Sequence, residues 1–371
     1  MRTFVFTCLL LLGMTIFAQD ANFHIYLCLG QSNMEGNAKV EEQDTVAVDS
    51  RFQVLAAVDC SNLGRTKGNW YKAVPPLARC YTGLTPGDYF GRAMVANLPS
   101  NVRVGIINVA VGGCRIELFD KDNYQSYVET SPDWLKNMVK EYGGNPYARL
   151  VEMAKLAQKD GVIKGILLHQ GESNTNDKDW PLKVKGVYDN LLNDLGLSAA
   201  NVPLLAGEVV HADQNGVCAS MNTIIDSLPQ VIPTAHVISS AGCPAAFDNL
   251  HFTAEGYRML GARYAAKMLS ILGYGDWTSA QNMKLWYNRP AQDWLEALPL
   301  GNSRLGAMVF GGTAREELQL NEETFWAGGP YNNNNPKGLQ VLPEIRRLIF
   351  EGKTLEAQKL IDENYMTPQH G

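Results

Sequence analysis

The chain has 371 residues, of which 46% are hydrophobic and 19% are charged. This length and composition allow a sizeable buried core and favour two domains rather than one. The formal net charge of −6 argues against general binding to nucleic acid.

The first residues are typical of a secretory signal peptide. Arg2 supplies a positive charge, residues 4–17 form an apolar run that is too short to span a membrane, and Ala18 is a small residue suited to cleavage. We therefore predict a signal peptide over residues 1–18, no membrane span, and a mature chain that is secreted or periplasmic.

Export to an oxidising compartment would allow disulfide bonds. Cys60 with Cys80 and Cys218 with Cys243 are plausible pairs, although sequence alone does not fix connectivity. The sequence contains no C-x-x-C pair and no cluster of histidines, so we predict neither a metal site nor a cofactor.

Five apolar runs rich in Val, Ile and Leu recur along the chain. They cover residues 23–30, 102–113, 161–170, 202–210 and 235–242. Their nearly continuous hydrophobicity is typical of strands that are buried on both faces of a parallel sheet. Helix-like segments over residues 146–161 and 253–273 lie between and after them. The pattern predicts a three-layer α/β/α sandwich around a mostly parallel five-stranded sheet.

Polar residues and glycines follow the predicted strands, where ligands of open parallel sheets bind. In chain order they are Ser32; Gly112 and Gly113; Gln170, Glu172, Ser173 and Asn174; Glu208 and His211; and Asp248 and His251. All of them are therefore expected at the carboxyl edge of the sheet.

A serine hydroxyl becomes a useful nucleophile only beside a base, and the base needs a partner that orients its ring. Asp248 and His251 lie three residues apart just before a predicted helix, so one turn could supply both groups. His169 and His211 also lie near this edge and remain alternatives, either as bases or as substrate contacts. Backbone N–H groups of the "VGG" segment could stabilise an oxyanion.

Four segments, "GQSNMEG", "VGG", "HQGESN" and "DNLHFTAEGY", resemble in order the conserved blocks of the SGNH-hydrolase superfamily. They are most similar to the branch of sialate O-acetylesterases and of acetyl xylan esterases of carbohydrate esterase family six. The resemblance implies a flavodoxin-like esterase domain over residues 19–272. It also implies that Ser32 is the nucleophile, His251 the base and Asp248 its orienting partner.

The same resemblance implies an oxyanion hole formed by the N–H groups of Ser32 and Gly113. In the third block Ser173 stands where the wider superfamily has an asparagine, so Gln170, Glu172 or Asn174 could complete the hole.

The implied substrate is an acetylated carbohydrate. Candidate substrate contacts are Gln31, Asn33, Arg115, Glu172 and Trp70.

A different pattern begins after a predicted linker over residues 273–282. Residues 283–371 show alternating strand-like segments, and "PLGNSRLGAMVFGG" and "LNEETFWAGGP" resemble the N-terminal β-sandwich of glycoside hydrolase family ninety-five, a family of α-L-fucosidases and galactosidases. We interpret this part as the truncated start of such a domain, fused covalently to the esterase, and assign no glycosidase activity to it. An accessory β-module is the alternative.

The sequence therefore favours a secreted serine esterase that removes O-acetyl groups from carbohydrate. Two other classes stay open: a glycosidase that uses Glu172 and Glu208 as its carboxylate pair, and a non-catalytic carbohydrate-binding module. The variant Ser32→Ala separates the three, because only an esterase depends on that hydroxyl.

Overall fold

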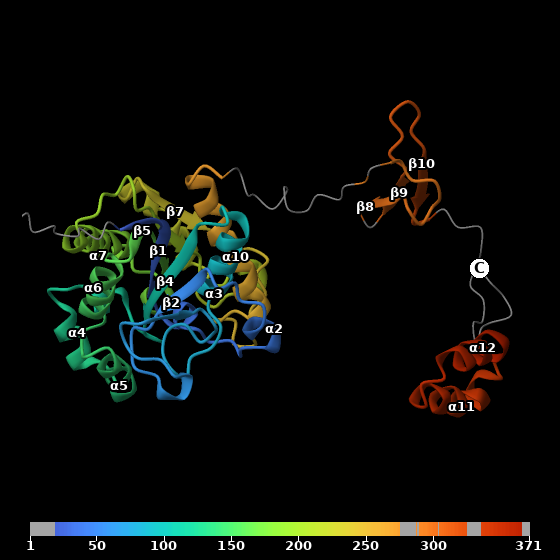
Figure 1. Ribbon diagram of the computed structural model, residues 1–371, viewed down its shortest axis with the longest axis horizontal. Coiled ribbons are helices and arrows are strands. Elements are labelled where there is room, and N and C mark those ends of the chain that lie inside the picture. The colour runs from blue at the N-terminus through green and yellow to red at the C-terminus, as the bar shows by residue number, and fades with distance from the viewer. Residues whose placement is uncertain (1–18, 275–286, 288, 303, 325–334, 366–371) are drawn as a thin grey trace, which may run out of the picture. The chain divides into compact units, whose positions relative to one another are not determined.

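The computed structural model (Figure 1) describes residues 19–274, 287, 289–302, 304–324 and 335–365 of the chain. It divides into two compact units, Met1–Lys284 and Leu285–Gly371. The predicted signal peptide and residues 275–282 of the predicted linker lie outside the described residues. Among the described helices, none combines the length and the apolar character needed to cross a membrane.

The first unit is built on a seven-stranded sheet. Its strands are β1 (Asp20–Gly30), β2 (Phe52–Leu55), β3 (Trp70–Lys72), β4 (Arg103–Ala110), β5 (Gly161–His169), β6 (Leu204–Gly207) and β7 (Ala235–Ile238). They lie in the order β3-β2-β4-β1-β5-β6-β7, and every neighbouring pair is parallel except β2 with β3. The predicted fold class is confirmed, with β2 and β3 added at one edge.

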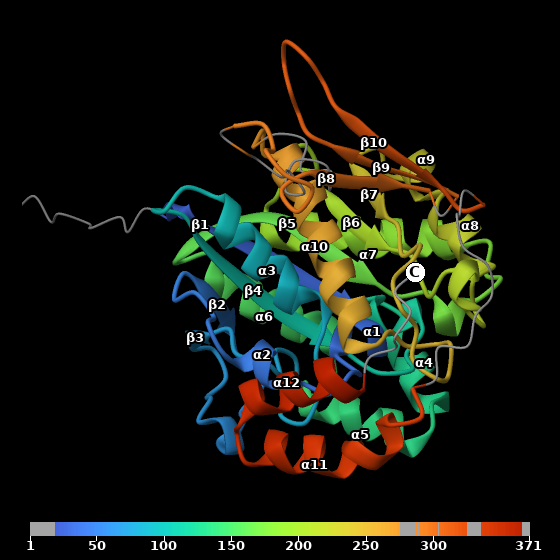
Figure 2. The ribbon, with the colours of Figure 1, turned by 90° about the vertical axis from the view of Figure 1, so that its right-hand side faces the viewer.

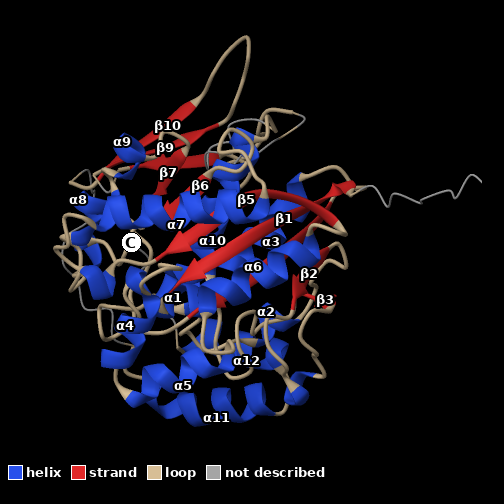
Figure 3. Ribbon diagram, turned by 90° about the vertical axis from the view of Figure 1, so that its left-hand side faces the viewer, coloured by secondary structure: helices blue, strands red, loops and turns tan. Residues whose placement is uncertain are grey.

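Helices cover both faces of this sheet. The longer ones are α3 (Pro86–Asn97), α5 (Asp133–Glu141), α6 (Pro146–Ala157), α7 (Trp180–Leu195) and α10 (Ala254–Ile271). The shorter α-helices are α1 (Ser32–Glu35), α2 (Glu42–Thr45), α4 (Tyr124–Thr130), α8 (Met221–Ile225) and α9 (Leu228–Val231). Short 3-10 turns are η1 (Ser61–Leu63), η2 (Ile116–Phe119), η3 (Glu172–Asn174) and η4 (Ala212–Gln214). Helices α3 and α10 lie on the face turned to the viewer in Figure 2, and α6 and α7 on the face shown in Figure 3.

The sequence of the central strand β1 is almost continuously apolar because both faces of the strand pack against helices. Phe23, Ile25 and Leu27 point into the core beneath α6 and α7, whereas Tyr26 and Cys28 point into the core beneath α3 and α10. Both sets are fully buried. A strand that packs on two helical layers has no solvent-facing side chains, so its apolar residues do not alternate with polar ones.

Two cysteine pairs were plausible from the sequence, and only one forms. Cys60 and Cys80 are bonded, which confirms that pair. The pairing of Cys218 with Cys243 is wrong, because both are free thiols. Cys218 packs against the core on the α6 and α7 side, whereas Cys243 belongs to the core on the α3 and α10 side, so the sheet separates them.

The second unit contains a three-stranded antiparallel sheet followed by two helices. The sheet order is β10-β9-β8, with β8 (Leu298–Gly301), β9 (Leu305–Val309) and β10 (Leu318–Glu322). The helices are α11 (Gly338–Phe350) and α12 (Thr354–Asn364). The antiparallel strands agree with the predicted β-rich segment, but the sequence pattern did not predict the helices.

Candidate active site

Ser32 is the first residue of α1 and follows the end of the central strand by two positions. The sharp change of direction requires a glycine before it. Gly30 has φ +151°, and a β-carbon added there would lie 2.0 Å from the carbonyl oxygen of His169. At the other end of α1, Gly36 has φ +110°, and a β-carbon added there would lie 2.3 Å from the carbonyl oxygen of Gly83. The two glycines thus let the chain place the serine hydroxyl at the carboxyl edge of the sheet.

The imidazole of His251 lies between Ser32 and Asp248. Its Nε2 atom is 2.8 Å from the Ser32 Oγ, and its Nδ1 atom is 2.7 Å from Oδ2 of Asp248. These are the contacts of a nucleophile, a base and an orienting carboxylate.

Asp248 is fixed by the turn that carries it. Its Oδ1 accepts hydrogen bonds from the backbone N–H groups of Leu250 and His251, each at 3.0 Å, and Asn249 takes the left-handed conformation with φ +53°. Partial burial opposes ionisation of Asp248, but the hydrogen bonds from the side chain and backbone of His251 outweigh it and hold the pKa of Asp248 below its ordinary value. The carboxylate is therefore charged at neutral pH and can stabilise an imidazolium.

The "VGG" loop after β4 lies directly beside Ser32. A β-carbon added to Gly112 would lie 3.8 Å from the Ser32 Cβ, and Gly113 has φ +70°. Neither the N–H of Ser32 nor that of Gly113 donates a hydrogen bond to another described residue. Two adjacent backbone donors without protein partners are suited to an oxyanion.

Gln170 and Asn174 are 1% exposed and hold the surrounding loops together. The amide nitrogen of Gln170 donates to Oε1 of Gln31, to the carbonyl of Cys114 and to Oδ1 of Asn174, and its oxygen accepts from the indole of Trp180. The amide nitrogen of Asn174 donates to two carboxylates. With their donors engaged in this way, the two side chains support the site rather than offer a free N–H group to an oxyanion.

Three of the proposed substrate contacts are buried framework residues. The side-chain oxygen of Gln31 accepts from the N–H of Ser173 at 3.2 Å. Asn33 is completely buried, donates to a carboxylate oxygen of Glu172 and to the carbonyl of Leu250, and accepts from the hydroxyl of Tyr257. This network joins the loop of Ser32 to the loop of His251.

The other two proposed contacts differ in position. Arg115 is exposed near the "VGG" loop and forms ion pairs with Glu117 and Asp177. Trp70 packs on Phe23 and donates to Asp160, both at the amino ends of the strands. Because β1 rises about 3.3 Å per residue from Phe23 to Gly30, Trp70 lies roughly 20 Å from Ser32. The structure thus places Trp70 at the opposite edge of the sheet from the site.

His169 and His211, the alternative bases, and Glu172 and Glu208, the alternative carboxylate pair, have other partners in the structure. His169 is fully buried, its Nε2 contacts the carbonyl of Glu208 at 2.9 Å, and burial lowers its pKa. His211 caps η4. Glu172 and Glu208 are both buried, and the Glu208 carboxylate accepts from Ser239 and Ser240. Among the described residues, neither histidine hydrogen-bonds to Ser32, and the carboxylate of Glu172 accepts from Asn33, so both glutamates are engaged by protein groups.

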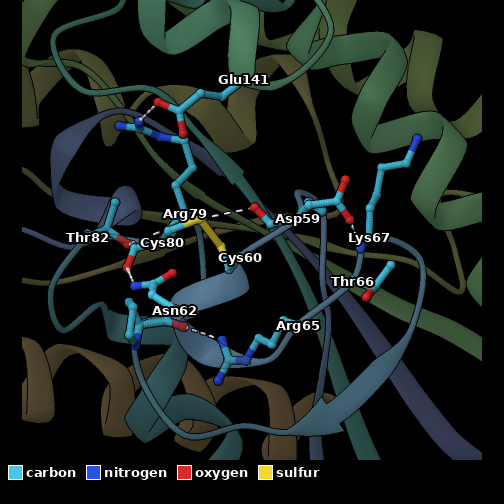
Figure 4. The surroundings of a disulfide bond; sticks show 12 residues. Asp59, Cys60, Asn62, Arg65, Thr66, Lys67, Arg79, Cys80, Thr82 and Glu141 are labelled. Atoms are coloured by element: carbon cyan, nitrogen blue, oxygen red, sulfur yellow. Dashed lines mark hydrogen bonds and ion pairs between the residues drawn. A yellow bond between two sulfur atoms is a disulfide. The ribbon is translucent and has the colours of Figure 1, made fainter.

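An ion pair between Arg79 and Glu35, the last residue of α1, was not predicted from the sequence. Arg79 binds a carboxylate oxygen of Glu35 at 2.5 Å and also pairs with Glu141 at the end of α5. Figure 4 shows Arg79 next to the Cys60–Cys80 bond, with Glu141 at the end of its side chain. Residues so far apart in the chain leave no local pattern, so only the structure reveals the pair. In the described part of the chain, no group of three His, Cys, Asp or Glu side chains is arranged to hold a metal ion.

Comparison with known proteins identifies the family and the fold of the first unit. The family described as "Carbohydrate esterase, sialic acid-specific acetylesterase" matches residues 22–270. A probable carbohydrate esterase of Arabidopsis thaliana is 25% identical over 261 residues, covering 66% of this chain and 90% of the relative. Two crystal structures share the fold. One is from Arabidopsis thaliana (TM-score 0.52, 22% identity, 68% of this chain and 99% of that chain). The other is NanS (TM-score 0.51, 14% identity, 70% and 99%).

The second unit matches a different family. Residues 285–370 match "Glycosyl hydrolase family 65, N-terminal domain". Alpha-L-fucosidase 2 of Arabidopsis thaliana is 43% identical over 75 residues, which are 20% of this chain but only 9% of the fucosidase. The chain therefore spans a small part of these relatives.

The match over residues 22–270, together with the shared fold, shows that the chain belongs to the family of carbohydrate esterases described as sialic acid-specific acetylesterases, and that its first unit is a carbohydrate esterase.

Proposed function

We propose that the protein hydrolyses O-acetyl esters on carbohydrate through an acyl-enzyme formed on Ser32. The observation that carries this proposal is the position of the His251 imidazole, within hydrogen-bond distance of both Ser32 and Asp248. Acyl transfer needs this arrangement, whereas a glycosidase or a binding module does not.

In the first half-reaction, the Ser32 Oγ attacks the acetyl carbonyl carbon while Nε2 of His251 takes the hydroxyl proton. The carbonyl oxygen becomes negative and is stabilised by the N–H groups of Ser32 and Gly113. The ester bond to the sugar breaks, and His251 returns the proton to the departing sugar oxygen. Asp248 stabilises the imidazolium through Nδ1.

In the second half-reaction, a water molecule gives its proton to His251 and attacks the acetyl carbon. The tetrahedral intermediate collapses, acetate leaves, and the proton returns to Ser32. His251 thus acts first as base and then as acid in each half, and the N–H groups of Ser32 and Gly113 are used twice.

The test is acetate release from O-acetylated sugar by the full chain and its Ser32→Ala variant. We expect Ser32→Ala to lower kcat by at least about 10³-fold. Ser126→Ala is the matched control, because Ser126 is an exposed serine of α4 that bonds only within its own helix region. Equal turnover by the wild-type protein and Ser32→Ala would contradict the mechanism.

We further propose that the protein acts outside the cytoplasm and on glycans that a fucosidase-like activity also attacks. The signal-like residues 1–18 support the first point, and the match of residues 285–370 supports the second. An acetyl group removes a hydroxyl donor from the sugar, and a pocket built for that hydroxyl rejects the acetylated sugar. Deacetylation would therefore precede glycoside cleavage.

This coupling can be measured with an added α-L-fucosidase. Fucose release from an acetylated glycan should rise after treatment with wild-type protein and stay at the untreated level after treatment with Ser32→Ala. Chemically deacetylated glycan should give the same release in both cases. The coupling is wrong if wild-type treatment removes acetate but leaves fucose release unchanged.

A further inference from the structure

An aromatic side chain that the mechanism does not use lies at the edge of the site. Trp134 is 53% exposed, whereas Trp180 is fully buried and Trp70 is partly covered. The indole N–H groups of Trp180 and Trp70 donate to protein oxygens, but the indole of Trp134 has no hydrogen-bond partner among the described residues. Single exposed aromatic rings are common on protein surfaces, so the position of Trp134 beside the proposed site, rather than its exposure, points to a ligand.

The ring lies directly on the proposed oxyanion loop. A β-carbon added to Gly113 would lie 2.6 Å from Cη2 of Trp134, so the glycine makes room for the ring. The preceding residue, Gly112, lies next to Ser32, at 3.8 Å between the added β-carbon and the serine Cβ. Because consecutive α-carbons are about 3.8 Å apart, the six-membered ring of Trp134 lies no more than about 13 Å from Ser32. A sugar chain whose acetyl group is bound at Ser32 can extend over that distance.

The helix that carries Trp134 is held in place by the core and by an ion pair. Trp134 is the second residue of α5, whose Leu135 and Val139 are buried in the core. The last residue of the same helix, Glu141, pairs with Arg79, and Arg79 also pairs with Glu35 in the helix that begins at Ser32. A single guanidinium therefore links the helix of the tryptophan to the helix of Ser32, so the backbone that carries Trp134 is fixed relative to Ser32 before a ligand arrives.

We propose that Trp134 stacks on the apolar face of the sugar ring that carries, or adjoins, the acetyl ester, and so determines specificity for carbohydrate over simple esters. A pyranose has faces of C–H groups and an edge of hydroxyls. The exposed indole offers an apolar face and an N–H donor to match them. This inference rests on the proposed esterase function, which supplies the class of ligand.

The experiment compares Trp134→Ala and Trp134→Phe with the wild-type full chain on an O-acetylated methyl glycoside and on ethyl acetate. For Trp134→Ala we expect kcat/KM to fall roughly 10-fold or more on the glycoside, mainly through KM, and to change less than about 2-fold on ethyl acetate. Trp134→Phe should restore most of the loss because a flat apolar face remains. Equal losses on both substrates would show that the ring only supports Gly113. No loss on either substrate would show that Trp134 contributes to neither binding nor turnover. Each of these two results would overturn the proposal.

A binding measurement keeps this result separate from the esterase proposal. In the Ser32→Ala background, titration with the deacetylated methyl glycoside reports contact with the sugar without any turnover. We expect quenching of tryptophan fluorescence that Trp134→Ala abolishes, with unchanged thermal melting as the check on folding. If the wild-type protein cleaves no acetate ester, the proposed function fails, whereas unaltered glycoside binding by Trp134→Ala would overturn the stacking proposal alone.

Discussion

The Nε2 atom of His251 lies 2.8 Å from Oγ of Ser32, although 219 positions separate the two residues. The contact forms because Ser32 follows the central strand β1 and His251 follows the edge strand β7, and both strands end at the same edge of the sheet. In a parallel sheet, the carboxyl ends of all strands meet at one edge, so distant residues converge there.

Asp248→Asn should leave the fold intact and remove most of the activity. The amide would no longer carry the charge that stabilises the His251 imidazolium, and it could favour the wrong imidazole tautomer. We expect kcat on an acetate ester to fall roughly 10³- to 10⁴-fold with little change in melting temperature. Asp122→Asn is the matched control, because the Asp122 side chain is exposed and contacts neither Ser32 nor His251. Activity of Asp248→Asn within a factor of ten of the wild type would argue against the orienting role.

Gly30→Ala should destabilise the protein strongly, whereas Gly186→Ala should stabilise it. At position 30 an added β-carbon would meet a carbonyl oxygen at 2.0 Å, and the backbone has φ +151°. We expect a loss of about 3 kcal/mol or more in the free energy of unfolding. Gly186 lies on the exposed side of α7 with nothing within 4 Å, so alanine there should add about 0.5–1 kcal/mol. Urea denaturation measures both, and equal stabilities for the two variants would contradict the strained turn.

Asp88 should make the stability of the fold depend on pH. This carboxyl group is completely buried in α3, one of its oxygens has no partner, and burial raises its pKa to about 8. In the unfolded chain its pKa is near 3.8. Between these values the folded protein holds a proton that the unfolded chain releases, so the stabilising contribution is complete below about pH 4 and is lost as the pH rises toward 8. We expect the melting temperature of the wild type to fall relative to that of Asp88→Asn between pH 5 and pH 8. A constant difference over that range would refute the assignment.

The ion pair between Arg79 and Glu35 should contribute to stability. Their side chains are only 12% and 11% exposed, so removing one partner leaves a buried charge. Arg79→Met should cost about 3–5 kcal/mol in unfolding free energy. The double variant Arg79→Met/Glu35→Gln should recover part of that loss. Chemical denaturation of the two single variants and the double variant gives the coupling energy, and strict additivity would show that the pair is not coupled.

A strand of this sheet can be predicted from the sequence when both of its faces are buried. Strands β1, β4 and β5 are long, apolar and covered on both faces, so composition alone reveals them. Strand β2 lies in a short apolar run, residues 54–58, that was not among the predicted strands, whereas β3 has three residues, is only partly buried and gives no hydrophobic run. The position of Trp70 follows from the direction of β3, of which it is the first residue. Strand β3 runs antiparallel to β2, and its first side chain covers the amino ends of β1 and β4 instead of reaching the site.

Within the site, the residues that can be predicted from the sequence are those whose partners lie nearby in the chain. Asp248 and His251 share one turn, so their spacing already indicates a carboxylate–imidazole pair. Arg79 and Trp134 act through residues far away in the chain, and their immediate neighbours give no sign of it. Gln170 and Asn174 have the right chemistry for an oxyanion hole, but sequence cannot show that their donors are already engaged.

Ser32 and His251, the proposed catalytic pair, belong to parts of the chain that should open at different rates. Strand β1 is hydrogen-bonded on both sides from His24 to Gly30, so its amides should exchange with deuterium only on global unfolding. Every residue from 244 to 251 is at least partly exposed, and this segment contains no helix or strand. Local unfolding of residues 244–251 would move His251 away from Ser32, while Ser32 stays at the end of β1. Mild denaturant should therefore abolish turnover at concentrations that leave the β-sheet signal in circular dichroism unchanged.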